Sequence, residues 1–198
     1  VNESFGDFSV VPHKEDRTKS KIRFGLYSIK NFGEGVAKSI IDERKARGPY
    51  TSLANFLERT HGKNLNRKGL ESLIKSGALD KLEDRGAMLE SIEALLAYSK
   101  EHAGKHTSQD SLFGGEGGEH GLTLPSAEPI EIGQKLAWEK ELLGLYVSGH
   151  PLEKFKDILN TQKHTIAATK GEVREGMPIV VYGIIEEAKP ILTKKGDQ

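Results

Sequence analysis

The segment 24-FGLYSIKNFGEGVAKSII-41 restricts the possible fold more than any other part of this sequence. Apolar residues recur at helical spacing at both of its ends and stop in its middle, where Gly33 and Gly35 stand two residues apart. Glycine has no Cβ atom, so it permits positive φ and lets another molecule come close to the backbone. The pattern therefore predicts two short amphipathic helices joined by a tight hairpin.

The start of the second helix in this segment is a candidate anion site. Its first amides have no partner within the helix and point outward, so they can receive a phosphate, and Lys30 and Lys38 flank them. The spacing of Gly33, Gly35 and Ser39 resembles the helix-hairpin-helix motif of DNA-binding proteins. A purely structural pair of helices is the alternative interpretation.

A second copy of this hairpin is expected at 66-NRKGLESLIKSGALDKL-82, because paired motifs bury a core that one alone cannot. Its turn, Ser76–Gly77, is degenerate, so this copy taken alone favours packing over binding. The candidate DNA-contacting residues of the two copies are Lys30, Asn31, Gly33, Glu34, Gly35, Lys38, Ser76 and Gly77.

The rest of the chain reads as mainly helical. Two short strands are expected within residues 5–24, and two more at Ile179–Ile185 and Ile191–Thr193. Helix starts are expected at Thr51 or Ser52, at Asn66, at Asp84 for one long helix fading near His102, at residue 132 for a helix to 147, and at Pro151. Residues 104–128 have no apolar period and predict a linker.

Composition excludes several functional classes. The chain has no cysteine, which removes disulfides and thiolate chemistry, and no run of 18 apolar residues that could span a membrane. Its first residues, VNESFGDF, lack the features of a signal peptide, so a cytoplasmic location is expected. Net charge is zero, but residues 1–80 hold 15 Lys or Arg against 10 Asp or Glu, so the front is basic.

No catalytic or metal site is recognisable. His102 and His106 have a spacing that can bind zinc on a helix, but no third ligand is near them. The glycines of 114–118 lack the preceding strand of a nucleotide-binding loop. We therefore predict no catalytic residue, no metal ligand and no cofactor in this chain.

One apolar pair stands inside the predicted linker. Leu112 and Phe113 end the stretch 109-QDSLF-113, which has the composition of a docking peptide: an amide sets its orientation and two apolar side chains fill a pocket on a partner. The alternative is that the pair folds back onto the core of this chain.

Taken in order, the segments VNES, IRFGLYSIKNFGEG, NRKGLESLIKSGALD, QDSLFG and LAWEKELLGLYVSGHPL resemble the alpha-subunit family of bacterial DNA polymerase III over nearly the whole chain. The resemblance implies a DNA-directed DNA polymerase that uses Mg²⁺, with its catalytic aspartates upstream of Val1. It identifies Gln109, Asp110, Ser111, Leu112 and Phe113 with the peptide that binds the sliding clamp, the beta subunit. Duplex DNA and other holoenzyme subunits are the further partners it implies, with no membrane.

The resemblance also implies a domain order. Residues 1–24 end the fingers domain, 25–103 form the tandem helix-hairpin-helix region, and 104–130 are the linker with the clamp-binding peptide. A helical segment at 131–175 and a truncated start of an OB fold at 176–198 follow. The competing hypotheses are a free-standing, non-catalytic helix-hairpin-helix adaptor and a protein-interaction scaffold that never touches DNA.

Overall fold

The structure is a computed structural model that describes residues 1–13, 16–60, 65–102, 122–161, 176 and 182–189. Its contacts divide the chain into two compact units, Val1–Ser148 and Gly149–Gln198. Within the described residues the chain is mainly helical with one two-stranded sheet, which confirms the predicted fold class.

The predicted N-terminal strand pair is present. Strand β1 (Ser9–Val11) pairs antiparallel with β2 (Lys21–Arg23), in a register that places Val10 opposite Ile22. A 3-10 turn, η1 (Arg17–Lys19), lies between the two strands. Backbone amides of Leu26 and Tyr27 donate to the carbonyls of Phe5 and Gly6, and these bonds join the strand pair to the helices that follow.

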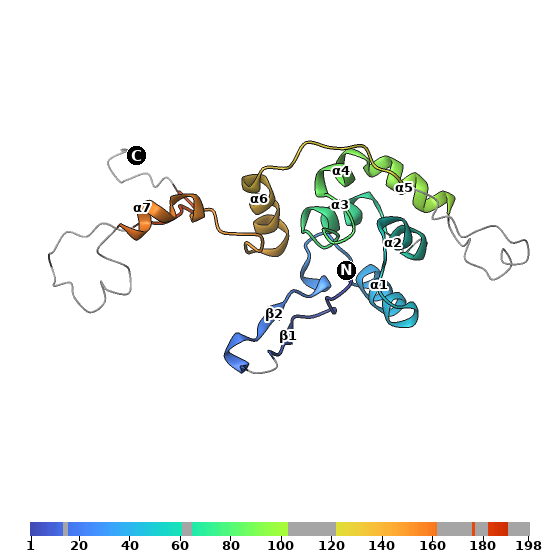
Figure 1. Ribbon diagram of the computed structural model, residues 1–198, viewed down its shortest axis with the longest axis horizontal. Coiled ribbons are helices and arrows are strands. Elements are labelled where there is room, and N and C mark those ends of the chain that lie inside the picture. The colour runs from blue at the N-terminus through green and yellow to red at the C-terminus, as the bar shows by residue number, and fades with distance from the viewer. Residues whose placement is uncertain (14–15, 61–64, 103–121, 162–175, 177–181, 190–198) are drawn as a thin grey trace, which may run out of the picture. The chain divides into compact units, whose positions relative to one another are not determined.

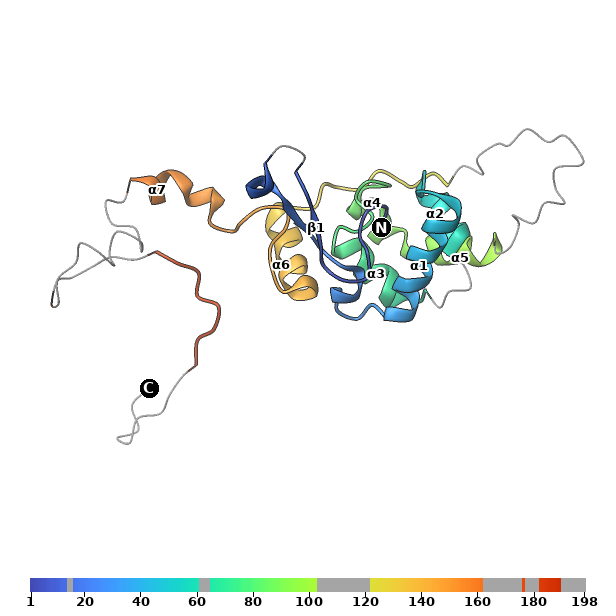
Figure 2. The same ribbon diagram turned by 90° about the horizontal axis from the view of Figure 1, so that it is seen from below.

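Seven further elements build the described part of the first unit. They are η2 (Leu26–Ser28), α1 (Glu34–Arg47), α2 (Leu53–Thr60), α3 (Arg67–Lys75), α4 (Arg85–Glu90), α5 (Ile92–Glu101) and α6 (Ile132–Leu143). Helix α3 contacts α4, α5 and α6, and in both views it lies between α6 and the α1–α2 pair (Figures 1 and 2). Their apolar faces meet in one core that includes Ile40, Phe56, Leu70, Leu73, Met88 and Leu95.

Three helix starts follow the predicted capping chemistry. The hydroxyl of Ser52, rather than that of Thr51, accepts from the amide of Asn55 at 3.1 Å. The side chain of Asn66 accepts from Gly69 N at 2.8 Å, and Asp84 accepts from two amides at the start of α4. Each side chain satisfies a helical amide that would otherwise lack a partner, which is why these positions could be predicted.

Two predicted helices differ from the structure. The long helix after Asp84 is divided into α4 and α5 at Ser91, whose φ of −101° and ψ of 12° leave the helical region; serine favours helix ends over helix interiors. Helix α6 ends at Leu143, before the predicted residue 147, because Gly144 takes the left-handed conformation with φ of 79° and terminates the helix.

A buried arginine closes the end of α1. Arg59 on α2 is only 7% exposed, and its Nη2 donates to the backbone carbonyls of Glu43 at 3.1 Å and Gly48 at 2.8 Å. The guanidinium also lies 4.4 Å from the ring centroid of Tyr50. A cation at a helix C-terminus is favourable because the last carbonyls carry partial negative charge. Arg59 therefore fixes the direction of α1 relative to α2.

The second unit contains two short elements among its described residues, η4 (Glu153–Phe155) and α7 (Lys156–Asn160), in place of the single helix predicted from Pro151 to Leu159. Residues 182–189 have no regular secondary structure, so the described part of the predicted strand at Ile179–Ile185 is not a strand. A strand needs a neighbour to complete its hydrogen bonds, and the predicted neighbour, Ile191–Thr193, lies outside the described residues.

No helix in the described part of the chain combines the length and the apolar character that a membrane crossing requires.

Replacing Arg59 by methionine should lower the free energy of unfolding by about 2–4 kcal/mol, because the carbonyls of Glu43, Gly48 and Pro49 and the Glu43 carboxylate lose a charged donor. The matched control is Arg47→Met on α1, where an arginine that is 50% exposed contacts the same Glu43. That exposed pair is expected to contribute at most about 1 kcal/mol. Denaturant titration of both variants measures the difference, and equal losses would contradict this role of Arg59.

Candidate nucleic-acid interface

Asn31 is the residue with left-handed backbone conformation in the turn of the first hairpin, with a φ of 63°. The glycines do not serve that purpose, which corrects the expectation from the sequence: Gly33 is the extended N-cap of α1 with φ of −71°, and Gly35 lies within the first turn of the helix. Asparagine tolerates the left-handed region better than most residues, because its short side chain can bond locally. The glycines therefore require a different explanation.

Neither glycine is required by the packing of this chain. A Cβ atom built on Gly35 meets nothing within 4 Å, and one on Gly33 meets only Val36 Cγ2 at 3.9 Å. Both residues are exposed. Glycine within a helix costs stability relative to alanine, by up to about 1 kcal/mol. Open space on the outer side of both glycines is the arrangement that a close approach by another molecule needs.

The positive end of α1 lies at this open surface. The amides of Val36 and Ala37 donate to the Gly33 carbonyl at 3.1 Å and 3.0 Å, which are the first hydrogen bonds of the helix. The amides of Glu34 and Gly35 come before them in the chain. Gly33 has no side chain with which to cap them. Helix α1 has 14 residues, and the amides at its start carry partial positive charge. Glu34 is an exposed acid in the same turn.

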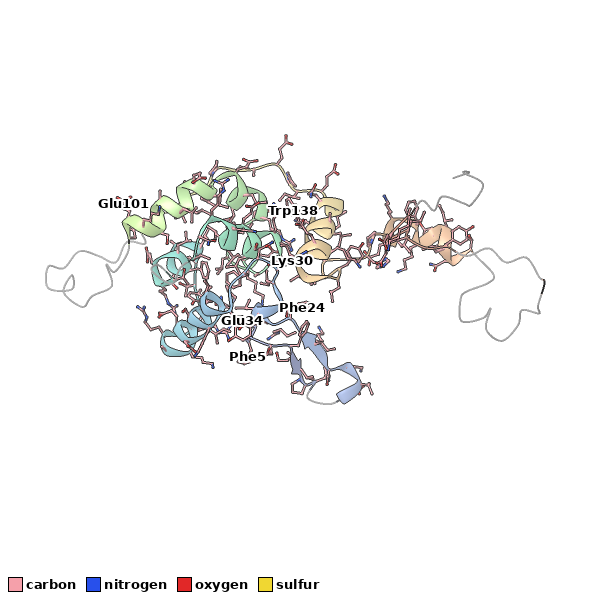
Figure 3. All side chains as sticks on the ribbon, turned by 180° about the vertical axis from the view of Figure 1, so that it is seen from behind. Phe5, Phe24, Lys30, Glu34, Glu101 and Trp138 are labelled. Atoms are coloured by element: carbon pink, nitrogen blue, oxygen red, sulfur yellow. The ribbon has the colours of Figure 1, made fainter. Side chains whose placement is uncertain are left out.

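The hairpin is held in place by two other helices. The backbone amide of Lys30 donates to the Leu142 carbonyl of α6 at 2.9 Å, and Phe32, 6% exposed, lies against the first turn of α3. The side chains of Lys30 and Lys38 are exposed (Figure 3 labels Lys30 beside α6 and Glu34 at the start of α1). The structure thus places Lys30 just before the turn and Lys38 one helical turn after the start of α1, both exposed.

The second hairpin is organised differently. Ser76 is 9% exposed, and its hydroxyl donates to the Leu73 carbonyl at 3.0 Å. Gly77 has a φ of 76°, and a Cβ atom there would lie 2.2 Å from Nη2 of Arg85. The space beside this turn therefore holds an arginine of the same chain, an arrangement that favours packing over an external ligand.

Arg85 belongs to a buried network that sequence reasoning missed. Its guanidinium donates twice to Asp80 at 2.7 Å, to the Lys75 carbonyl at 3.2 Å and to Glu139 of α6 at 3.1 Å. The side chains of Arg85 and Glu139 are 4% and 0% exposed. The only signal in the sequence is a carboxylate on the inner side of an apolar helix, in 136-LAWEKELL-143.

Glu139 also holds the residues after α6. Its Oε2 accepts from the backbone amides of Val147 and Ser148, each at 2.8 Å, and its Oε1 accepts from the Ser148 hydroxyl. Burial alone would raise the pKa of Glu139, but the hydrogen bonds from Ser148, Val147 and Arg85 outweigh burial and leave its pKa below the ordinary value. Glu139 is therefore ionised in the folded chain.

The predicted docking peptide, Gln109 to Phe113, lies outside the described residues, as does His106. The residues on either side of that interval are part of the first unit. Helix α5 ends at Glu101, and Leu122 and Leu124 are partly buried against the same core. Among the residues that the structure describes, no group of three or more His, Asp or Glu side chains is placed to hold a metal ion.

Comparison with known proteins identifies the local motif and the wider similarity. Residues 1–88 match the model of a family described as a helix-hairpin-helix motif. The chain is 37% identical over 199 residues to a protein of Thermus aquaticus named DNA polymerase III subunit alpha. It is 35% identical over 211 residues to the protein of that name in Borreliella burgdorferi, and 39% identical over 163 residues to the one in Deinococcus radiodurans.

These alignments cover 99%, 100% and 80% of this chain but only 16%, 17% and 12% of the three relatives. The chain therefore spans well under a fifth of the length of the curated relatives that it matches.

The Glu139 network predicts a pH dependence of stability. Because folding lowers the pKa of Glu139, its contribution is complete above the unfolded pKa, 4.5, and is lost as the pH falls through the lower folded value. Glu139→Gln should destabilise the chain at pH 7 and flatten the loss of stability below about pH 5. Glu141→Gln on the exposed side of α6 is the control. Unfolding free energies from pH 7 to 3 test this, and parallel curves for Glu139→Gln and the unmodified chain would contradict it.

Proposed function

We propose that this chain holds duplex DNA by its phosphate backbone and tethers a replicative polymerase to its sliding clamp, on the premise that it is homologous to one segment of the DNA polymerase III alpha subunit and contains a helix-hairpin-helix motif. The parent protein is then a DNA-directed DNA polymerase that uses Mg²⁺. Its partners are duplex DNA, the beta subunit and other subunits of the holoenzyme. This chain's share of the task is binding.

One observation supports the DNA contact above the others: the open start of α1. Two glycines leave its first amides accessible, nothing in this fold lies within 4 Å of a Cβ on Gly35, and Lys30 and Lys38 are exposed beside it. Free amides at a helix start and lysines on the same hairpin suit a phosphate oxygen, because each donates to negative charge. Contacts of this kind carry no base information, so the segment would bind duplexes of any sequence.

The clamp contact rests on the peptide Gln109–Phe113 and its position in the chain. A peptide with two apolar residues binds weakly alone, because ordering it costs part of the free energy gained by burying Leu112 and Phe113. A clamp that encircles DNA is already close to a segment that holds the same DNA. The second contact is then made at a high effective concentration, and together the two contacts keep the polymerase on its template.

Substituting the two hairpin lysines should weaken DNA binding without changing specificity. Lys30→Ala with Lys38→Ala should lower the affinity for unrelated duplexes equally and reduce the slope of log affinity against log salt by about 0.9 for each lost phosphate contact. Lys45→Ala with Lys100→Ala removes the same charge from exposed positions elsewhere on α1 and α5. Fluorescence anisotropy over a salt series measures both slopes.

Gly35→Val provides a second, uncharged test of the same contact. The fold has room for the new side chain, so the unfolding free energy should change by no more than about 1 kcal/mol, while the close approach of a phosphate is blocked. Full affinity for duplex in Gly35→Val, or an unchanged salt slope in the lysine double variant, would exclude this turn as the contact.

The clamp contact predicts a separation of binding from stability. Leu112→Ala with Phe113→Ala should remove most of the affinity for a purified bacterial beta subunit and leave the melting temperature nearly unchanged. Gln109→Ala should act in the same direction but less, and Glu116→Ala, which lies outside the peptide in the same predicted linker, is the control. If the pair instead packs on this chain's own core, the double variant should lose about 2–5 kcal/mol of stability and keep its clamp affinity.

A further inference from the structure

The second copy of the hairpin, residues 66–82, has two places that could contact DNA. They are its turn, Ser76–Gly77, and the start of its first helix, α3. We propose that it contacts the DNA backbone through Arg67 and Lys68 at the start of α3, and not through the turn. This inference rests on the function proposed above, and it assigns to α3 a role that its sequence pattern does not indicate.

The hairpin turn is unsuited to an external phosphate because its space is already filled. Nη2 of Arg85 lies where a Cβ atom of Gly77 would be, and the same guanidinium is neutralised by Asp80 and Glu139. The positive charge beside the turn is therefore matched by two carboxylates of this chain. An incoming phosphate would have to compete with both of them inside a buried network.

The start of α3, in contrast, adjoins the first hairpin. A Cβ atom built on Gly69 would lie 3.6 Å from Cδ2 of Phe32, so the ring of Phe32 packs against the backbone in the first turn of α3. Lys68 directly precedes Gly69, and Asn31 directly precedes Phe32, so the exposed residues of both elements border one buried contact. A molecule seated on the turn of the first hairpin is thus within reach of the side chains at the start of α3.

The cations at this position are available to a ligand. Lys68 is exposed, and the side chain of Arg67 is 58% exposed. Arg67 forms an ion pair with Glu93 of α5, whose side chain is 73% exposed. An ion pair between two solvated groups contributes little, about 0–1 kcal/mol, so the arginine can exchange the carboxylate for a phosphate at low cost.

A nucleic-acid backbone is the occupant that this surface fits. The side chains of Lys30, Lys38, Lys68 and Arg67 provide positive charge at exposed positions on the first hairpin and at the start of α3, against the exposed carboxylates of Glu34 on α1 and of Glu93 beside Arg67. The planar guanidinium of arginine and the ammonium of lysine are the side-chain groups that bind successive phosphates of a nucleic-acid backbone. The surface would therefore hold the same strand that the first hairpin receives.

The test is the salt dependence of duplex binding by the full 198-residue chain. Arg67→Gln with Lys68→Gln should reduce the slope of log affinity against log salt by about 0.9 for each lost contact, up to about 2 in total. The matched control, Lys81→Gln with Lys100→Gln, removes the same charge; Lys81 shares the surface beside Gly77, so it also reports on the alternative contact at the turn. Unchanged melting temperatures confirm that the variants fold.

A second variant should act in the opposite direction. Glu93→Gln releases Arg67 from its ion pair without touching the core, so it should tighten duplex binding at low salt, and the gain should vanish when Arg67 is also changed to Gln. The inference is overturned if the Arg67–Lys68 variant keeps its full salt slope while the slope of the Lys30–Lys38 variant falls. It is also overturned if the salt slope falls more in the Lys81–Lys100 variant than in the Arg67–Lys68 variant. If neither hairpin nor α3 substitutions alter the slope, the proposed DNA contact itself fails.

Discussion

The ion pair between Arg85 and Glu139 is the interaction on which the presentation of the first hairpin depends. Burying both charges is costly, and the cost is offset because donors from Ser148 and Val147 and acceptors from Asp80 and Lys75 satisfy the remaining positions. The pair holds α6 beside α3 and α4. Helix α6 in turn offers the Leu142 carbonyl that receives the Lys30 amide, so a network buried under one turn determines how another turn is displayed.

The turns of the two predicted hairpin copies differ in the space beside them. The turn at Gly33–Gly35 has open space on its outer side, whereas the one at Gly77 is filled by Arg85. The degenerate turn at Ser76–Gly77 favours packing, but its partner could not be predicted locally, because the filling side chain comes from the next helix and is kept there by a carboxylate 54 residues further along the chain. A turn with open space beside it can bind a ligand, whereas a turn whose space is occupied by a side chain of the same chain packs against its neighbours.

Local chemistry explains what could be predicted. The caps at Ser52, Asn66 and Asp84 bond to amides within a few residues of the same segment. Helical spacing of apolar residues identifies the buried helix faces. Both features could therefore be predicted from the sequence. The roles of Arg59 and Glu139 depend on contacts between distant segments, which no local pattern contains. The candidate site follows the same rule. Lys30, Gly35 and Lys38 are exposed as expected, whereas the positive φ belongs to Asn31 and Ser76 is buried.

Leu122 and Leu124 lie against the same core as α5, and α6 is bound through Arg85, Glu139 and the Lys30–Leu142 hydrogen bond. The residues before 103 and those after 121 are therefore joined by packing and hydrogen bonding as well as by the chain itself. Covalent continuity through this interval is not what holds α6 to the hairpin, so cleavage of a peptide bond there would leave two polypeptides associated as one folded body.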